Sequence, residues 1–220
     1  MNRLVFEKTG SAVYISHLDL IRIFQRCFRR AGMLLKHSQG FTPHAYVSIM
    51  LPLPVGMSSR CEIIDFELDE SDKTPLEQVP ELLNRTMPAG IRVLQFYQSD
   101  RKPKELAYLR AKLTLEYDNG VTDACVDAIS KLLAQDEILL EKQTKSGNLT
   151  EQNIKQMLPE YQLVREENTL TIECVVCAQN PSLNPMQLSR AIAKYLPEFA
   201  PDFASCERLQ LLDKDGKPFA

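Results

Sequence analysis

The chain has 220 residues, of which 44% are hydrophobic and 25% charged, and its formal net charge is −3 at pH 7. This composition is typical of a globular protein with enough chain for one large domain or two small ones. No window approaches the roughly 18 consecutive apolar residues of a membrane helix. The stretch MNRLVFEKTG lacks the apolar region and cleavage site of a signal peptide. We therefore expect a cytoplasmic protein with no membrane partner.

The net charge hides an uneven distribution along the chain. Residues 1–60 contain eight Lys or Arg residues and two acidic residues, whereas the rest of the chain contains 18 basic and 27 acidic residues. The N-terminal portion is therefore strongly basic, which favours an anionic partner for that portion. The acidic remainder argues against indiscriminate binding to polyanions.

The first two predicted elements are a strand at residues 3–16, with a turn allowed at Thr9–Gly10, and a helix at residues 16–32. Ser16 is a good N-cap, Asp19 three residues later approximates a capping box, and Gly32 is a natural stop. At about 100° per residue the helix has one apolar and one charged face. The apolar face comprises Leu20, Ile21, Ile23, Phe24, Cys27, Phe28 and Ala31, and the charged face comprises Asp19, Arg22, Arg26, Arg29 and Arg30.

The charged face of this helix is the firmest electrostatic feature of the sequence. We call its four arginines the arginine ridge: Arg22, Arg26, Arg29 and Arg30. A planar guanidinium group can make two charge-assisted hydrogen bonds to one phosphate, so the ridge is a candidate site for nucleic-acid phosphates. The alternative is a solvated helix face with an Asp19–Arg22 ion pair.

After a short predicted strand at residues 33–37, the stretch KHSQGFTPH (36–44) is a second candidate site. Gly40 would let backbone N–H groups approach a ligand closely, Phe41 could stack on a base, and Lys36 could meet a phosphate. The predicted nucleic-acid contacts in this stretch are Lys36, Gln39, Gly40, Phe41 and His44. The alternative is an ordinary loop between strands, with Phe41 filling the core.

The remainder of the first half completes a βαββαβ order. Strands are predicted at residues 45–51, 61–70 and 90–98, and a helix at 74–88. Pro80 must lie in the first turn of that helix or delay its start. This order is that of a ferredoxin-like unit, and a polar linker follows it.

The second half repeats this plan loosely. Its predicted elements are strands at 106–117, 138–145 and 206–213, a hairpin at 161–178, helices at 121–135 and 184–197, and a short inserted helix within 148–161. We therefore predict an α+β protein of two ferredoxin-like units with antiparallel sheets, at residues 1–99 and 100–220. The alternative is a single mixed sheet with helices on one face. Lys142 and Lys145 would extend the basic surface from the second half.

Acid–base chemistry has two candidate residues, His17 at the helix start and His44 in the loop, since histidine titrates near neutral pH. His17 also fits a satisfied position at the edge of the apolar face. No HExxH, P-loop, GxGxxG or paired CxxC motif is present, so we predict no metal and no cofactor. The six cysteines do not form a disulfide pattern. Cys174 and Cys177 lie three apart in a predicted strand and should point to opposite faces.

Two stretches of the chain resemble a known bacterial family. They are KTGSAVYISHLDLIRIFQRCFRRAG (8–32) and SQGFTPHAYVSIMLPLPVGMSSRCEIIDFEL (38–68), with a weaker match at 141–148. Their KTG turn, SHLDL helix, SQGF loop, LPLPVG segment and acidic strand are similar to those of the radical SAM-linked protein family, a domain of unknown function. Ala45 departs from this pattern, because members commonly carry a second proline there, and the change would loosen the loop.

The resemblance implies a partner rather than a reaction. Members are fused to, or encoded beside, a radical S-adenosylmethionine protein, and this chain lacks the CxxxCxxC cluster motif. The leading hypothesis is a non-catalytic RNA-binding protein that presents tRNA or rRNA to such an enzyme for modification. One alternative is a metal-independent ribonuclease that uses His17 or His44 with Lys36. The other is a protein-binding adaptor that uses its basic half.

Overall fold

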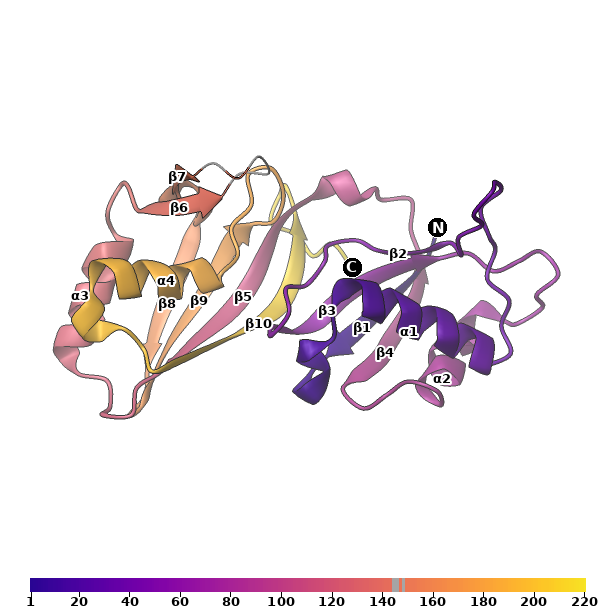
Figure 1. Cartoon of the computed structure of the whole chain (residues 1–220), viewed down its shortest axis with the longest axis horizontal. Helices are drawn as coiled ribbons and strands as arrows, with labels where there is room; N and C mark the ends of the chain where they lie inside the picture. The colour runs from indigo at the N-terminus through magenta and orange to yellow at the C-terminus, as the bar shows by residue number, and fades with distance from the viewer. Residues whose placement is uncertain (144–146, 148) are drawn as a thin grey trace. The chain divides into compact units, whose positions relative to one another are not determined.

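The computed structural model describes residues 1–143, 147 and 149–220 (Figure 1). Over these residues the chain is an α+β protein with mostly antiparallel strands, as predicted. It divides into two compact units, residues 1–105 with Ala220 and residues 106–219. Lys145, one of the predicted nucleic-acid contacts, lies outside the described residues. Among the described residues, no helix is long and apolar enough to cross a membrane.

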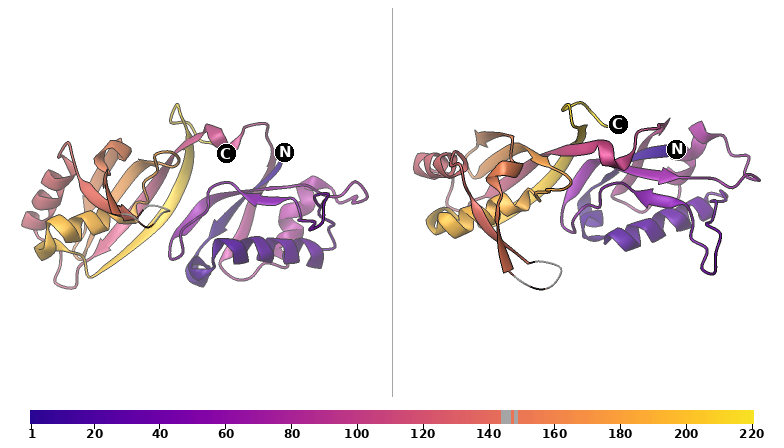
Figure 2. Two further views of the ribbon diagram at one scale, coloured as in Figure 1. Left: turned by 45° about the horizontal axis from the view of Figure 1, so that its top comes forward. Right: turned by 90° about the horizontal axis from the view of Figure 1, so that it is seen from above.

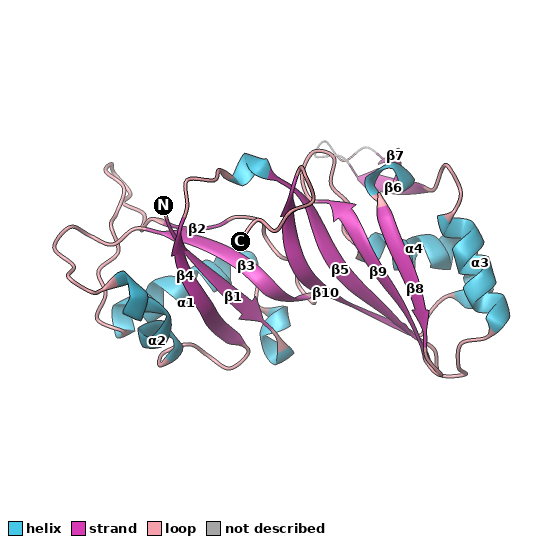
Figure 3. Cartoon of the chain, turned by 180° about the vertical axis from the view of Figure 1, so that it is seen from behind, coloured by secondary structure: helices cyan, strands magenta, loops and turns pink. Residues whose placement is uncertain are grey.

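The first unit has the element order β1-α1-β2-β3-α2-β4. The bounds are β1 Asn2–Lys8, α1 His17–Arg30, β2 Val47–Ile49, β3 Ser58–Phe66, α2 Val79–Asn84 and β4 Ile91–Gln98. The strands lie in the order β4-β1-β3-β2, and each neighbouring pair is antiparallel. Seen from behind, α1 lies behind the strands of its unit, so it covers one face of their sheet (Figure 3).

α1 forms because its sequence supplies a cap, an apolar face and a stop. The Ser16 Oγ accepts a hydrogen bond from the Asp19 N–H at 3.2 Å, which satisfies one donor of the first turn. Gly32 follows the helix with a φ of +79°, a conformation that favours glycine. Phe24 is fully buried and packs edge-on against Phe6 of β1, with ring centroids 4.8 Å apart. The core therefore fixes α1 and, with it, the arginine ridge on the opposite face.

The second unit has the order β5-α3-β6-β7-β8-β9-α4-β10. The bounds are β5 Leu106–Glu116, α3 Asp123–Leu133, β6 Leu139–Gln143, β7 Leu149–Asn153, β8 Glu160–Arg165, β9 Thr169–Cys177, α4 Met186–Tyr195 and β10 Phe203–Asp213. Four strands lie in the antiparallel order β10-β5-β9-β8, and β6 and β7 form a separate hairpin. This hairpin projects from its unit in the right-hand view of Figure 2.

The insertion in the second unit differs from the prediction. We predicted a short helix within residues 148–161, but β7 pairs antiparallel with β6, and a 3₁₀ turn follows at Lys155–Met157. The hairpin forms because α4, about 55 residues later in the chain, holds β6 in place. The Lys194 ammonium and the Tyr195 hydroxyl of α4 both donate to the Leu139 carbonyl of β6, at 3.0 and 2.8 Å. These bonds hold β6 beside α4, and β6 in turn offers β7 an edge for pairing.

The turn that the prediction allowed at Thr9–Gly10 is present, and it ends the strand predicted at residues 3–16. β1 ends at Lys8, and the chain turns at Gly10, with a φ of +55°, into a 3₁₀ helix. The Thr9 N–H donates to the Gly90 carbonyl at 2.7 Å, which ties this turn to the segment that enters β4. A contact across some 80 residues therefore decides where β1 stops.

Two other predicted elements of the first unit are also shorter than expected. Within residues 74–88 the α-helix covers six residues, after a 3₁₀ turn, and Pro80 lies in its first turn. Proline suits that position because an N–H there has no partner within the helix. The predicted strand at 33–37 consists of isolated bridges at Leu35 and His37.

Candidate functional site

The arginine ridge faces solvent, and all four of its residues are exposed. Arg22 Nη1 lies 2.9 Å from Asp19 Oδ1, with the two side chains 63% and 58% exposed. Water screens such a pair, so it contributes little to stability. The Ser16 hydroxyl, and then the Arg22 guanidinium, lower the pKa of Asp19, because both stabilise its carboxylate. The Asp19–Arg22 pair that we weighed as an alternative is therefore present at one end of the ridge.

The chain after α1 forms a hydrogen-bonded loop. The Ser38 N–H donates to the His44 carbonyl at 2.8 Å, and the His44 N–H donates to the Ser38 hydroxyl at 3.0 Å. We call these residues and those between them the 38–44 loop. Gly40 has a φ of +146° and open space where a side chain would begin, so its backbone is accessible. Phe41 is fully exposed, so the alternative in which it fills the core is wrong.

Lys36, at the base of this loop, has partners within its own unit. Its Nζ lies 2.9 Å from Glu67 Oε2 and 5.6 Å from the centroid of the Tyr46 ring. The hydrogen bond that Lys36 donates to the Glu67 carboxylate, and then the charge of that carboxylate, raise the pKa of Lys36. A phosphate at this position would have to compete with the Glu67 carboxylate. Lys36 is therefore a weaker candidate contact than the sequence indicates.

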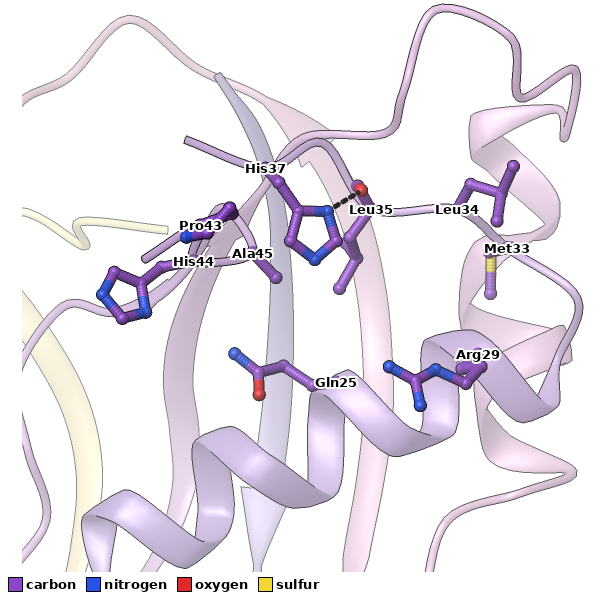
Figure 4. Close-up of a pocket in the computed structure, with 9 residues that line it drawn as sticks. All are labelled: Gln25, Arg29, Met33, Leu34, Leu35, His37, Pro43, His44 and Ala45. Carbon is purple, nitrogen blue, oxygen red and sulfur yellow. Dashed lines mark hydrogen bonds between the residues drawn. The ribbon is translucent and has the colours of Figure 1, made fainter. Parts of the chain in front are cut away.

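A pocket of about 350 Å³ lies between α1 and the 38–44 loop (Figure 4). α1 contributes Gln25 and Arg29 to its wall, and the following chain contributes Met33, Leu34, Leu35, His37, Pro43, His44 and Ala45. The pocket therefore brings together two predicted residues, Arg29 of the ridge and His44 of the loop. Of the described residues that line it, none is acidic, so an anionic ligand would meet no carboxylate on its wall.

Gln25 and His37 line this pocket: His37 lies within the stretch predicted as a site but was not singled out as a contact, and Gln25 was not predicted. His37 Nδ1 lies 2.9 Å from the Leu35 carbonyl oxygen. Because a carbonyl only accepts, Nδ1 carries the proton of this bond, and Nε2 of the neutral ring is an acceptor. In Figure 4, Nε2 faces the side of the pocket that α1 forms. The signal for Gln25 was its position one turn before Arg29, at the border between the charged and apolar faces.

Several predicted residues lie outside this pocket. His17 begins α1, eight residues before Gln25, which places it about 12 Å away along the helix axis. Gln39 and Phe41 are in the middle of the 38–44 loop, and neither is among the described residues that line the pocket. Lys142 is exposed on β6 of the second unit. The structure thus brings together one part of the predicted site, where α1 meets the loop.

The cysteines are free thiols. Cys174 is 1% exposed and Cys177 is half-buried, in keeping with side chains on opposite faces of β9. Burial raises the pKa of Cys174 to about 12, so this thiol stays protonated at neutral pH. Across the described part of the chain, no group of three or more His, Cys, Asp or Glu side chains is placed to hold a metal ion.

Comparison with known proteins places this chain in a bacterial family. Residues 2–185 match the family described as "Uncharacterized protein conserved in bacteria (DUF2344)". The chain belongs to this family. The match supports a bacterial domain without an assigned function, and its description names no radical S-adenosylmethionine partner. No protein with a curated description matches the chain in sequence.

The fold is similar to chains in two solved structures. One is "Crystal Structure of a Cbf5-Nop10-Gar1 Complex", with a TM-score of 0.52 and 9% identity over 96% of this chain and 48% of that chain. The other is "Structure of H/ACA RNP bound to a substrate RNA containing 2'-deoxyuridine", with a TM-score of 0.51 and 8% identity over 96% and 47%. This chain spans about half the length of the chains that it matches. At such identities the similarity shows a shared fold alone.

Proposed function

We propose that this protein binds RNA through the arginine ridge and the 38–44 loop. The observation that carries the proposal is the pocket between these two elements, since it joins the guanidinium side of α1 to a loop with a fully exposed Phe41. Proteins that bind single-stranded RNA combine cationic groups for the backbone with aromatic rings on which bases stack. The ridge would contact phosphates, and Gln39, Gly40, Phe41 and His44 would contact a sugar or a base.

The arrangement of strands supports this proposal at the level of the fold. In each unit the four strands of the main sheet lie in the order fourth, first, third, second. We therefore propose a ferredoxin-like duplication, with the β6–β7 hairpin inserted in the second unit. One structural neighbour is a ribonucleoprotein bound to a substrate RNA, which supports an association with RNA by analogy.

We further propose that the RNA is tRNA or rRNA and that a radical S-adenosylmethionine enzyme modifies it. The support for this partner is the resemblance of the KTG, SHLDL, SQGF and LPLPVG motifs to the radical SAM-linked family. The free cysteines support a reducing compartment, so we place this function in the cytoplasm.

Filter binding tests the proposed function. The purified chain is titrated with total tRNA, rRNA and matched double-stranded DNA at several salt concentrations. We expect selective RNA binding that weakens with salt, because each neutralised phosphate releases counterions, with a slope of about −0.7 in log K against log salt per contact. Arg26→Glu/Arg30→Glu should make the slope less negative by about 1.4. An RNA affinity that does not change with salt concentration, or no binding to any RNA, would contradict the proposal.

The same pocket supports a second candidate function, metal-independent cleavage of RNA. His37, His44 and Arg29 all line it, and paired imidazoles can act as base and acid. One would take the proton from a 2′-hydroxyl as its oxygen attacks the adjacent phosphorus. The other would protonate the leaving 5′-oxygen as the P–O bond breaks, which leaves a 2′,3′-cyclic phosphate. Cleavage in the presence of a chelator should fall roughly 10²–10⁴-fold in His44→Ala, and intact RNA with the wild-type chain would exclude this candidate.

A further inference from the structure

We propose that the pocket between α1 and the 38–44 loop holds a single unpaired nucleotide of the bound RNA, turned out of the base stack. This inference rests on the proposed RNA-binding function and adds the ligand of the pocket. It gives Gln25 and His37 a role in holding the base, and it separates Arg29 from the other arginines of the ridge.

The size and lining of the pocket fit one nucleotide. A volume of about 350 Å³ lies at the lower end of the roughly 300–1,000 Å³ found for small-molecule sites. That volume suits a base with its ribose and phosphate, and it is too small for a helical segment. Five of the lining residues are apolar, and the apolar surface comes mainly from Leu34, Pro43 and Ala45, since Met33 and Leu35 are buried. The flat faces of a base pack against apolar walls, whereas its edge requires hydrogen-bond partners.

The polar groups of the pocket can form hydrogen bonds with the edge of the base. The Gln25 amide offers a donor and an acceptor, and His37 Nε2 offers an acceptor in the neutral ring. The bond from His37 Nδ1 to the Leu35 carbonyl fixes the ring before any ligand arrives, which lowers the entropy lost on binding. Since no lining residue among those described is acidic, nothing on the wall repels the phosphate.

Arg29 connects this pocket to the rest of the proposed RNA path. It is the member of the ridge that lines the pocket, so its guanidinium group can meet the phosphate of the captured nucleotide. The neighbouring phosphates would then continue along Arg26 and Arg30, which are exposed on the same helix. Such backbone contacts position the strand, whereas contacts to the base edge select the nucleotide.

The exposed Phe41 offers a stacking surface to the bases next to the captured nucleotide. Turning a base out of the stack leaves its former neighbours without a partner, and an aromatic ring can stack in that place. Phe41 is fully exposed on the loop that walls the pocket. An unpaired nucleotide in an RNA loop is the least costly to capture, because no base pair has to break.

The first test uses free 5′-mononucleotides with the full chain, observed by ¹H–¹⁵N NMR. We expect weak binding of at least one of AMP, GMP, CMP and UMP, with chemical-shift changes around the pocket. Arg29→Gln and Arg30→Gln make the same charge change at adjacent exposed positions, but Arg29 lines the pocket. Arg29→Gln should therefore weaken mononucleotide binding much more than Arg30→Gln does. Gln25→Leu keeps the size of the side chain and should weaken binding roughly two- to tenfold.

The second test places 2-aminopurine in the loop of an RNA hairpin that the protein binds. Its fluorescence rises when the base leaves the stack, so the wild-type chain should increase the signal and Gln25→Leu should increase it less. Salt-sensitive RNA binding with no mononucleotide binding and no rise in fluorescence would overturn this inference and leave the proposed function standing. Equal losses of mononucleotide binding in Arg29→Gln and Arg30→Gln would also overturn it. If the wild-type chain bound neither RNA nor any mononucleotide, this inference and the proposed function would both be overturned.

Discussion

α1 of the first unit and α3 of the second both follow the first strand of their units, and both have a hydroxyl cap, Ser16 and Thr122. Their solvent faces differ. α1 exposes the arginine ridge, whereas α3 exposes Asp123, Asp127 and Lys131. The chain then takes 16 residues from α1 to β2, enough to wall a pocket, whereas the stretch from α3 to β8 contains the β6–β7 hairpin. The helix after the first strand thus has a cationic solvent face in one unit and a mixed one in the other, because exposed side chains vary independently of the buried face.

The two units also differ inside their sheets. β1 buries two charged residues, Arg3 and Lys8, whereas all the buried residues of β5 are apolar. Arg3 Nε lies 2.7 Å from Asp65 Oδ1, and Arg3 also donates to the Arg101 carbonyl. Charges taken out of water need such partners, so β1 depends on specific pairing where β5 depends on apolar packing.

Removal of Arg3 should therefore have the largest effect. Arg3→Met leaves Asp65 buried without its cation, and we expect the free energy of unfolding to fall by about 3–5 kcal/mol. Urea denaturation followed by circular dichroism measures this loss. Arg3→Met/Asp65→Leu should recover most of it, because no charge is left buried in that pair. If the single variant were as stable as the wild type, the pair would not explain the difference between β1 and β5.

A slightly smaller effect is expected at the turn that ends β1. Gly90 has a φ of +85°, and a Cβ there would lie 2.4 Å from the Thr9 carbonyl oxygen. Gly90→Ala should therefore cost more than the roughly 1–3 kcal/mol of a left-handed conformation alone. Gly216→Ala in the second unit is the matched control, since Gly216 has a φ of +74° and open space around it. Thermal unfolding compares the two variants. Equal falls in melting temperature would show that the backbone near Thr9 shifts to make room for the new Cβ.

Charge reversal on the two helices tests which solvent face binds RNA. Arg26→Glu on α1 and Lys131→Glu on α3 make the same charge change at exposed positions. We expect Arg26→Glu to weaken RNA binding roughly tenfold or more, because it would remove the proposed phosphate contact and add repulsion. Lys131→Glu should change the affinity much less. Filter binding at one fixed salt concentration gives the ratio, and similar losses for the two variants would contradict the assignment of the binding face to α1.

The smallest effect concerns the cap of α1 and depends on pH. The Ser16 hydroxyl and the Arg22 guanidinium hold the pKa of Asp19 below its usual value of 3.8. The carboxylate therefore stabilises the folded chain above that value, and this contribution disappears as the pH falls through the lowered pKa. Asp19→Asn should lower the melting temperature slightly at neutral pH and not in strong acid.

Asp127→Asn, on the exposed face of α3, is the control for this substitution. The melting temperatures of the wild type and of both variants are measured between neutral and strongly acidic pH. A difference between wild type and Asp19→Asn that stays constant with pH would show that the charge of Asp19 is not its cause.

The sequence predicts α1 well because the signals for that helix are local. Ser16 and Gly32 mark its ends, and the spacing of its apolar residues separates the buried face from the ridge within a few turns. Four of the predicted apolar residues are fully buried, namely Leu20, Phe24, Cys27 and Phe28, and the whole ridge is exposed. Short-range rules are sufficient for such a helix.

The pocket could not be predicted in the same way, because it depends on contacts between distant segments. The Lys36 N–H donates to the Glu67 carbonyl at 2.9 Å, and Leu35 forms a bridge to Leu68, so β3 and the chain after it decide the path of the loop. This path brings His37 and His44 to the pocket beside α1, whereas His17, the other histidine singled out in the sequence, lies at the start of the helix. The β6–β7 hairpin was missed for the same reason, since α4 holds it in place.

The exposure of Phe41 has a practical consequence for measuring any ligand. The chain contains no tryptophan, so Phe41→Trp would create a single indole whose emission comes from the loop alone. A side chain with no buried surface contributes little to the stability of the folded chain. The variant should therefore unfold like the wild type, and its fluorescence would report in real time any ligand that reaches the 38–44 loop.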